Sequence, residues 1–176
     1  TVGGSPTDFS GLAHAVVLRT LAAYGPNRVR VTAFDPGLSS DLGLYSELRQ
    51  VDRLAVPPAI NTTDAFEHSL IELVTDLGKV EDVLASQGLH SVLDSGEARQ
   101  IRLLLIYSAA GPLSQQGAQN LAQVLRVGGP RGLFALLADD AMRALVPSRP
   151  GGLPSVSIRG RAISHSELPG VDITRD

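Results

Sequence analysis

The chain has no cysteine and no tryptophan among its 176 residues. The lack of cysteine excludes disulfide bonds, a thiol nucleophile, iron–sulfur clusters and cysteine-bound zinc. Aromatic residues are few, four Phe and three Tyr, which argues against a nucleic-acid site built on base stacking. The formal net charge of −3 also sets the chain apart from nucleic-acid binders that are basic as a whole.

Long apolar runs are missing as well. A bilayer span needs about 20 predominantly apolar residues, and the longest run, around Leu103–Ile106, has the length of a strand. The first residues lack the charged and apolar regions of a signal peptide. We therefore expect a cytoplasmic domain, and the abrupt start at Thr1 suggests a segment cut from a longer protein.

What is present fits one globular domain, with 43% hydrophobic and 19% charged residues. Strands are predicted over Arg28–Asp35, Ile101–Tyr107 and Gly132–Ala138, and helices over Ser10–Tyr24, Thr63–Gln87, Ser114–Val127 and Asp139–Leu145. Thr63 is expected to cap the longest helix and Gly88 to end it. Strands that alternate with helices indicate an α/β fold with a parallel sheet.

The C-terminal part has a different composition. Residues 147–154 are rich in Pro and Gly and predict a linker. The alternation of apolar and polar residues in Ser155–Ile163 predicts an exposed edge strand of the same domain. We therefore divide the chain into an α/β core at residues 1–146 and a linker with an edge strand at residues 147–176.

Ligands of open parallel sheets bind at the carboxyl ends of the strands. The loop before the first helix is a candidate phosphate loop, and its residues are Gly3, Gly4, Ser5, Pro6, Thr7, Asp8, Phe9 and Ser10. Other strand ends place Asp35, Tyr107, Ser108, Asp139 and Asp140 at the same edge. Against the pattern GxxxxGK[ST], Asp8 replaces the second glycine and Phe9 the lysine. The alternative is an ordinary turn in which Asp8 or Ser10 caps the helix.

The order of these segments resembles the FtsK/SpoIIIE family of ring-shaped ATPases, which includes DNA translocases and the EccC motors of type VII secretion. The matching segments are Val17-Leu18-Arg19-Thr20-Leu21 with Pro26–Arg30, Phe34-Asp35-Pro36-Gly37, the helix from Ala65 to Gly88, Leu103–Ser108 and Gly132–Asp140. The resemblance covers most of residues 1–145. It implies a three-layer sandwich with a mostly parallel central sheet, of the RecA-like P-loop NTPase type.

The departures from the family pattern fall on its catalytic positions. Phe9 stands at the phosphate-loop lysine, Tyr107 and Ser108 stand at the acidic pair, and Asp139-Asp140 stand at the polar sensor pair. Lys79, the only lysine, lies on the long helix. Because ATP hydrolysis needs the cation, the metal clamp and an oriented water together, we predict a pseudo-ATPase without a metal site or a required cofactor.

The resemblance also implies partners. We expect the domain to act as a structural or regulatory protein-interaction module in a ring or tandem assembly. The resemblance to secretion motors also implies that the full-length protein is associated with a membrane. Its partners would be other ATPase domains of the same or a sister chain, or the signal peptide of a secreted protein. A cleft roofed by Phe9 and Tyr107 is the predicted contact.

Two alternatives remain open at this stage. In the first, the chain binds ATP without hydrolysis through the amides of Gly3–Thr7 and the hydroxyl of Ser10. In the second, it is a DNA-translocation accessory whose arginines touch phosphate, namely Arg143, Arg149, Arg159, Arg161 and Arg175. We rank this second alternative below a solvated, arginine-bearing edge.

Other enzyme classes are disfavoured by spacing. The histidines His14, His68, His90 and His165 form no HExxH-like pattern. Tyr107–Gly111 lacks the leading glycine of a G-x-S-x-G elbow. We therefore expect neither a histidine-bound metal nor a serine hydrolase, and we interpret Asp139-Asp140 as a cap of the next helix.

Overall fold

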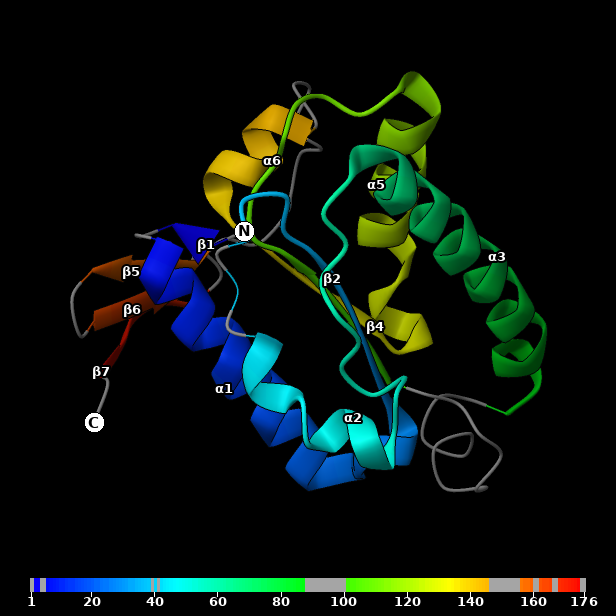
Figure 1. Cartoon of the computed structure of the whole chain (residues 1–176), viewed down its shortest axis with the longest axis horizontal. Helices are drawn as coiled ribbons and strands as arrows, with labels where there is room; N and C mark the ends of the chain where they lie inside the picture. The colour runs from blue at the N-terminus through cyan, green and yellow to red at the C-terminus, as the bar shows by residue number, and fades with distance from the viewer. Residues whose placement is uncertain are drawn as a thin grey trace.

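Figure 1 shows the computed structural model, in which two sheets are accompanied by helices. It describes residues 2–3, 6–38, 40, 42–87, 101–145, 156–159, 162–165 and 168–174. The predicted linker at residues 147–154 and the predicted stop at Gly88 lie outside these residues.

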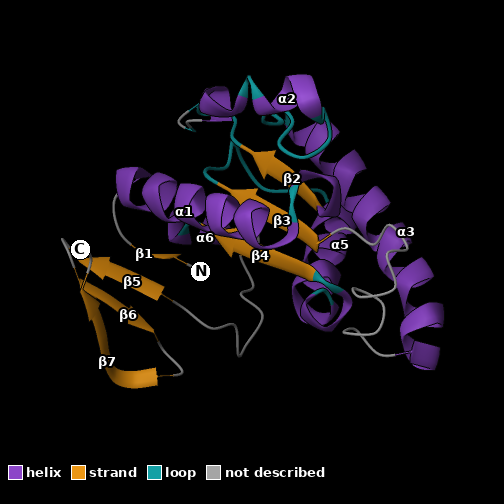
Figure 2. Cartoon of the chain, turned by 90° about the horizontal axis from the view of Figure 1, so that it is seen from below, coloured by secondary structure: helices purple, strands orange, loops and turns teal. Residues whose placement is uncertain are grey.

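The first sheet carries the candidate functional positions. It has the order β2-β3-β4, with β2 at Val29–Phe34, β3 at Ile101–Ile106 and β4 at Leu133–Leu137. All three strands run parallel, and Figure 2 shows their arrows pointing the same way. The predicted strands and the α/β fold class are therefore confirmed.

Helices lie on both faces of this sheet (Figures 1 and 2). Helix α1, Pro6–Tyr24, lies on one face, and α3, Thr63–Gln87, and α5, Gln115–Val127, lie on the other. Shorter elements connect them, namely η1 (Pro26–Arg28), η2 (Leu42–Tyr45), α2 (Leu48–Val51), η3 (Gly129–Arg131) and α6 (Asp139–Leu145).

The long helix α3 confirms the predicted bounds but not the predicted cap. The Oγ1 atom of Thr62 accepts a hydrogen bond from the Ala65 N–H at 3.4 Å, so Thr62 is the N-cap and Thr63 is the first helical residue. Phe66, Leu70, Leu73 and Leu77 of α3 are buried. The Phe66 ring stacks on Phe34 of β2 with 4.2 Å between ring centroids.

Helix α1 begins four residues earlier than predicted. Its first residue is Pro6 rather than Ser10. Proline is favoured at this position because its fixed φ suits a helix and its missing N–H would have no intrahelical partner there. The helix ends as predicted before Gly25, whose φ of 80° is in the left-handed region that glycine adopts readily.

The second sheet corrects the prediction for the C-terminal part. Its order is β1-β5-β6-β7, with β1 at Val2–Gly3, β5 at Val156–Arg159, β6 at Ala162–His165 and β7 at Leu168–Thr174. The predicted single edge strand over Ser155–Ile163 is thus two antiparallel strands. Strand β5 is not at an edge, because it pairs with β1 on one side and β6 on the other.

Candidate functional site

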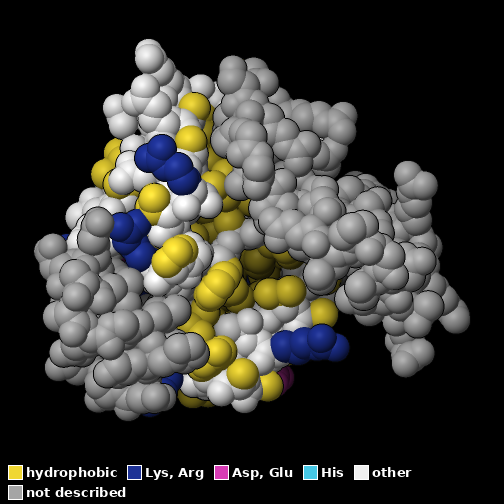
Figure 3. Space-filling model, turned by 180° about the vertical axis from the view of Figure 1, so that it is seen from behind, with side chains coloured by type: hydrophobic (Ala, Val, Ile, Leu, Met, Phe, Trp, Pro, Cys, Tyr) yellow, Lys and Arg dark blue, Asp and Glu magenta, His cyan; other side chains and the backbone are white. Residues whose placement is uncertain are grey.

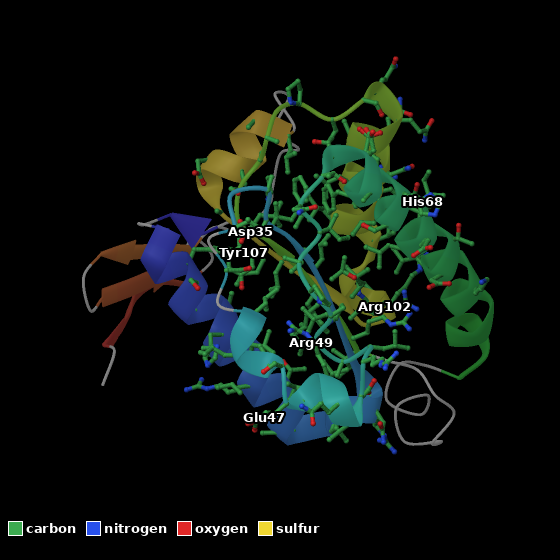
Figure 4. All side chains as sticks on the ribbon, viewed as in Figure 1. Asp35, Glu47, Arg49, His68, Arg102 and Tyr107 are labelled. Atoms are coloured by element: carbon green, nitrogen blue, oxygen red, sulfur yellow. The ribbon has the colours of Figure 1, made fainter. Side chains whose placement is uncertain are left out.

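The candidate residues of the first sheet meet at its carboxyl edge. Phe34 is in register with Ile106, and Ile106 with Leu137. The residues that follow these three, Asp35, Tyr107 and Ala138, therefore leave the sheet side by side. Figure 4 shows Asp35 and Tyr107 close together, far from Arg102 at the other end of the strands.

The predicted phosphate loop does not form a single loop. Gly3 belongs to β1, Gly4 and Ser5 lie outside the described residues, and Pro6–Ser10 form the first turns of α1. The side chains of Pro6, Thr7 and Asp8 are outside the described set. The prediction of an extended loop up to Ser10 is wrong because Pro6 already begins the helix.

Phe9, in the first turns of α1, packs against Tyr107. Their ring centroids are 5.0 Å apart and their planes are at 85°, an edge-to-face contact. Only 2% of Phe9 and 7% of Tyr107 is exposed. The predicted contact surface roofed by these two rings is therefore wrong, since both rings belong to the hydrophobic core.

Asp35 is a buried acidic side chain of the described site. It is fully buried, and its Oδ2 accepts a hydrogen bond from the Ser40 N–H at 2.6 Å. Its Oδ1 accepts from the Ser108 hydroxyl at 3.3 Å. A buried carboxylate requires such partners, so Asp35 here fixes the loop after β2 and joins it to the end of β3.

Ser108 and the turn at Gly37 complete this network. The Ser108 Oγ also accepts a hydrogen bond from the Gly37 N–H at 3.3 Å, and a Cβ on Gly37 would lie 3.2 Å from that same oxygen. Leu38 follows with a φ of 53°. Such a φ strains a non-glycine residue, and the Asp35 carbonyl accepts the Leu38 N–H at 3.1 Å.

Asp140, the second residue of the acidic pair after β4, has a local role. Asp140 is exposed, and its Oδ1 accepts the Ala141 N–H at 2.9 Å in the first turn of α6. This contact agrees with the interpretation of the pair as a cap at the start of α6. The side chain of Asp139 lies outside the described set, as do those of Arg143, Arg149, Arg159, Arg161 and Arg175.

A second polar cluster, which the sequence did not reveal, joins α3 to α5. The Glu67 carboxylate accepts hydrogen bonds from Ser114 N–H at 2.6 Å and from Ser114 Oγ–H at 2.7 Å. The Ser114 Oγ in turn accepts the Gly117 N–H at 3.0 Å as the N-cap of α5. The cap was recognisable from the sequence, but Glu67 lies 47 residues away.

Two of the histidines, His14 and His68, have described side chains, and they serve as hydrogen-bonding and surface groups. His14 Nδ1 lies 2.9 Å from the Tyr45 hydroxyl, and burial raises the pKa of Tyr45 to about 12. His68 is exposed and lies 3.7 Å from Glu72, one helical turn away. Within the part of the chain that the structure describes, no group of three or more His, Cys, Asp or Glu residues is placed to hold a metal ion.

The site as described offers buried hydrogen bonds and an aromatic contact rather than an exposed set of charged ligands. None of the described helices combines the length and the apolar composition needed to cross a bilayer. Comparisons of the chain with protein-family models, with curated proteins and with solved structures found no match.

Proposed function

We propose that the chain is a non-catalytic FtsK/SpoIIIE-like domain, a structural or regulatory protein-interaction module of a larger translocation or secretion motor. The proposal rests on the sequence resemblance together with one structural observation, the Phe9–Tyr107 contact. It includes the RecA-like three-layer architecture, which the parallel sheet with helices on both faces supports.

The Phe9–Tyr107 contact carries the proposal because of where it lies. In the resemblance these positions belong to the phosphate-binding lysine and the magnesium-holding aspartate. The two side chains touch across the ends of α1 and β3, which is the proximity that a phosphate site requires of its two motifs. Neither ring has a charge for a phosphate or a metal ion, so the contact favours packing in place of phosphoryl transfer.

Asp35 supports the same interpretation. Its carboxylate is the fully buried acidic group of the described site, and both of its oxygens accept hydrogen bonds from this chain. Phosphoryl-transfer sites hold their magnesium with carboxylates that face the nucleotide. The Asp35 carboxylate instead bonds to the loop after β2, a contact that stabilises the fold.

The decisive experiment is calorimetric titration of the chain with a non-hydrolysable ATP analogue and magnesium, together with a turnover assay. We expect no binding up to about 1 mM, the weak end of specific affinities, and no turnover. Micromolar binding or measurable hydrolysis would contradict the proposal.

A matched pair of variants tests the alternative of nucleotide binding without hydrolysis. If nucleotide binds through the predicted phosphate loop, Ser10→Ala weakens it, whereas Thr20→Ala, on the same helix, does not. The Thr20 hydroxyl donates to the Val16 carbonyl at 2.7 Å, so its role is confined to the helix. Equal affinity in both variants would count against that alternative.

A further inference from the structure

Exposed aliphatic side chains recur at regular positions in the segment that joins β2 to α3. This segment contains η2 and α2, and the structure describes all of residues 42–58. Leu44 is 71% exposed, Val51 is 80% exposed and Leu54 is 51% exposed. We define the outer stripe as Leu44, Glu47, Val51 and Leu54, all of which are exposed. Their spacing of 3, 4 and 3 residues is that of a contact seam along a helical segment.

The opposite side of the same segment is anchored to the core. Leu42 and Tyr45 are buried, and the Tyr45 hydroxyl lies 2.9 Å from Nδ1 of His14 on α1. The Arg49 guanidinium donates hydrogen bonds to the carbonyls of Leu42 and Val56. These contacts fix which side of the segment faces the core, so the outer stripe is held toward solvent. Exposed apolar side chains that cluster in this way mark surfaces for contact with another protein.

Two charges of opposite sign accompany the stripe. Glu47 lies within it, and Arg53 directly precedes Leu54. Both side chains are exposed. Among the side chains that the structure describes, ion pairs form at Asp76 and between His68 and Glu72, and neither Glu47 nor Arg53 takes part in one. An acid toward one end of a surface and a base toward the other make it complementary to a second copy of itself in the reverse direction.

The outer stripe lies on the border of the molecule that α2 forms. Figure 2 shows α2 at this border, on the far side of the first sheet from β5, β6 and β7. Hydrophobic side chains also lie open on the face seen from behind (Figure 3), but there they adjoin residues outside the described set. The stripe itself contains no such residue, and the exposure of all four of its side chains is therefore known.

We propose that the outer stripe is a self-association surface, on which a second copy of this chain packs about a two-fold axis. An antiparallel arrangement sets Leu44 of one copy against the partner's Leu54 and Glu47 against the partner's Val51. Glu47 then comes within reach of the partner's Arg53. Because a two-fold axis makes each contact twice, both charges of both copies are paired. The proposal goes beyond the proposed function and uses none of the candidate-site residues.

The size of the stripe predicts a weak dimer. Four side chains per copy are far fewer than the about 20–30 residues per side of a standard protein interface. We therefore expect a dissociation constant of about 100 µM, at which the dimer forms in concentrated solution and dissociates on dilution.

Sedimentation equilibrium of the 176-residue chain from about 5 to about 500 µM tests this expectation, because the range spans the expected dissociation constant. The average mass should rise from that of one chain toward that of two. A constant mass over the whole range would overturn the proposal. A mass beyond that of two chains would also overturn it, since a two-fold contact closes on itself.

Matched variants locate the contact. Val51→Glu and Leu44→Glu should each weaken association about tenfold or more, because each places a charge in the apolar part of the interface. Ile71→Glu is the control, since Ile71 is 50% exposed on α3, outside the stripe, and should leave association unchanged. Equal losses at Val51 and Ile71 would show that the dimer forms elsewhere.

A mixing experiment tests the pairing of the charges. Glu47→Arg and Arg53→Glu should each weaken association about threefold or more, because like charges then meet across the axis. An equimolar mixture of the two variants should associate at least as tightly as the unaltered chain, since every Arg then faces a Glu. Such a rescue also excludes misfolding as the cause of the single losses. A mixture no tighter than the separate variants would overturn the proposed arrangement.

The two proposals fail separately. Nucleotide turnover would overturn the proposed function and leave the self-association surface untouched, because the stripe shares no residue with the candidate site. A mass that stays at one chain, with no nucleotide binding, would overturn only the self-association proposal.

Discussion

The two ends of the parallel sheet are built on different physical principles. The carboxyl end is closed by the buried Phe9–Tyr107 contact and by the buried carboxylate of Asp35. The amino end carries partly exposed ion pairs such as Arg102–Asp76. Loss of a partner lowers the free energy of unfolding far more for a buried group than for an exposed one. Substitutions at the carboxyl end should therefore destabilise the protein more than substitutions at the amino end.

The largest effect is expected at Phe9. Phe9→Ala should lower the free energy of unfolding by about 3 kcal/mol or more, because it removes a fully packed ring and leaves a cavity beside Tyr107. Phe134→Ala is the matched control, since Phe134 is 50% exposed on β4, and should cost about 1 kcal/mol or less. Equal losses in urea unfolding would show that the carboxyl end is not the better packed one.

Asp35 ranks second. Asp35→Ala should lower the free energy of unfolding by about 2 kcal/mol, because the Ser40 N–H and the Ser108 hydroxyl lose their acceptor. Asp140→Ala, an exposed carboxylate at the same edge, should cost about 0.5 kcal/mol. A similar midpoint shift for both variants would contradict the structural role of the buried carboxylate.

At the contact between Glu67 and Ser114, the effect of Gly117→Ala on the free energy of unfolding should depend on whether Glu67 is present. A Cβ on Gly117 would lie 2.7 Å from the carboxyl carbon of Glu67, so Gly117→Ala should displace Glu67 from Ser114 and lower the free energy of unfolding by about 1 kcal/mol. In a Glu67→Ala background the same substitution should stabilise by up to about 1 kcal/mol, because alanine favours a helix over glycine.

Gly78→Ala is the control for this cycle, because a Cβ there would meet nothing within 4 Å. It should stabilise α3 in both backgrounds by about the same amount. Stabilisation by Gly117→Ala in the unaltered chain would show that Glu67 moves away without loss and does not hold α5.

The smallest effect is expected at the amino end. Asp76→Asn should lower the free energy of unfolding by about 1 kcal/mol or less, since the Asp76 and Arg102 side chains are 28% and 22% exposed. Partial burial acts to raise the pKa of Asp76, but the Arg102 and Lys79 charges and hydrogen bonds outweigh it and leave the pKa below its usual value. The stabilisation is therefore present above the ordinary aspartate pKa and lost as the pH falls through the lowered one.

Unfolding midpoints at neutral and acid pH check this sign. The difference between the unaltered chain and Asp76→Asn should shrink as the pH falls. Glu72→Gln, at a carboxylate that is 70% exposed, is the control and should show a smaller pH-dependent difference. A difference that grows toward acid pH would contradict the assignment of Asp76 as a group with a lowered pKa.

Much of the secondary structure followed from local patterns. The bounds of α3 and α6 agree with the periodicity and flanking residues, and the three strands of the first sheet are correct within two residues. These features depend on neighbours within a few positions, where apolar spacing and caps act. The alternation of strand and helix also predicted the α/β class correctly.

The sequence by itself thus determined the three strands of the first sheet, most bounds of the helices beside it and the absence of cysteine chemistry. Only the tertiary structure decided that Phe9 packs on Tyr107, that β1 pairs with β5 and that Glu67 reaches Ser114. These contacts join residues 47 to 154 positions apart in the chain. No local periodicity encodes such pairings, because they depend on how the strands cross over and which faces become buried together.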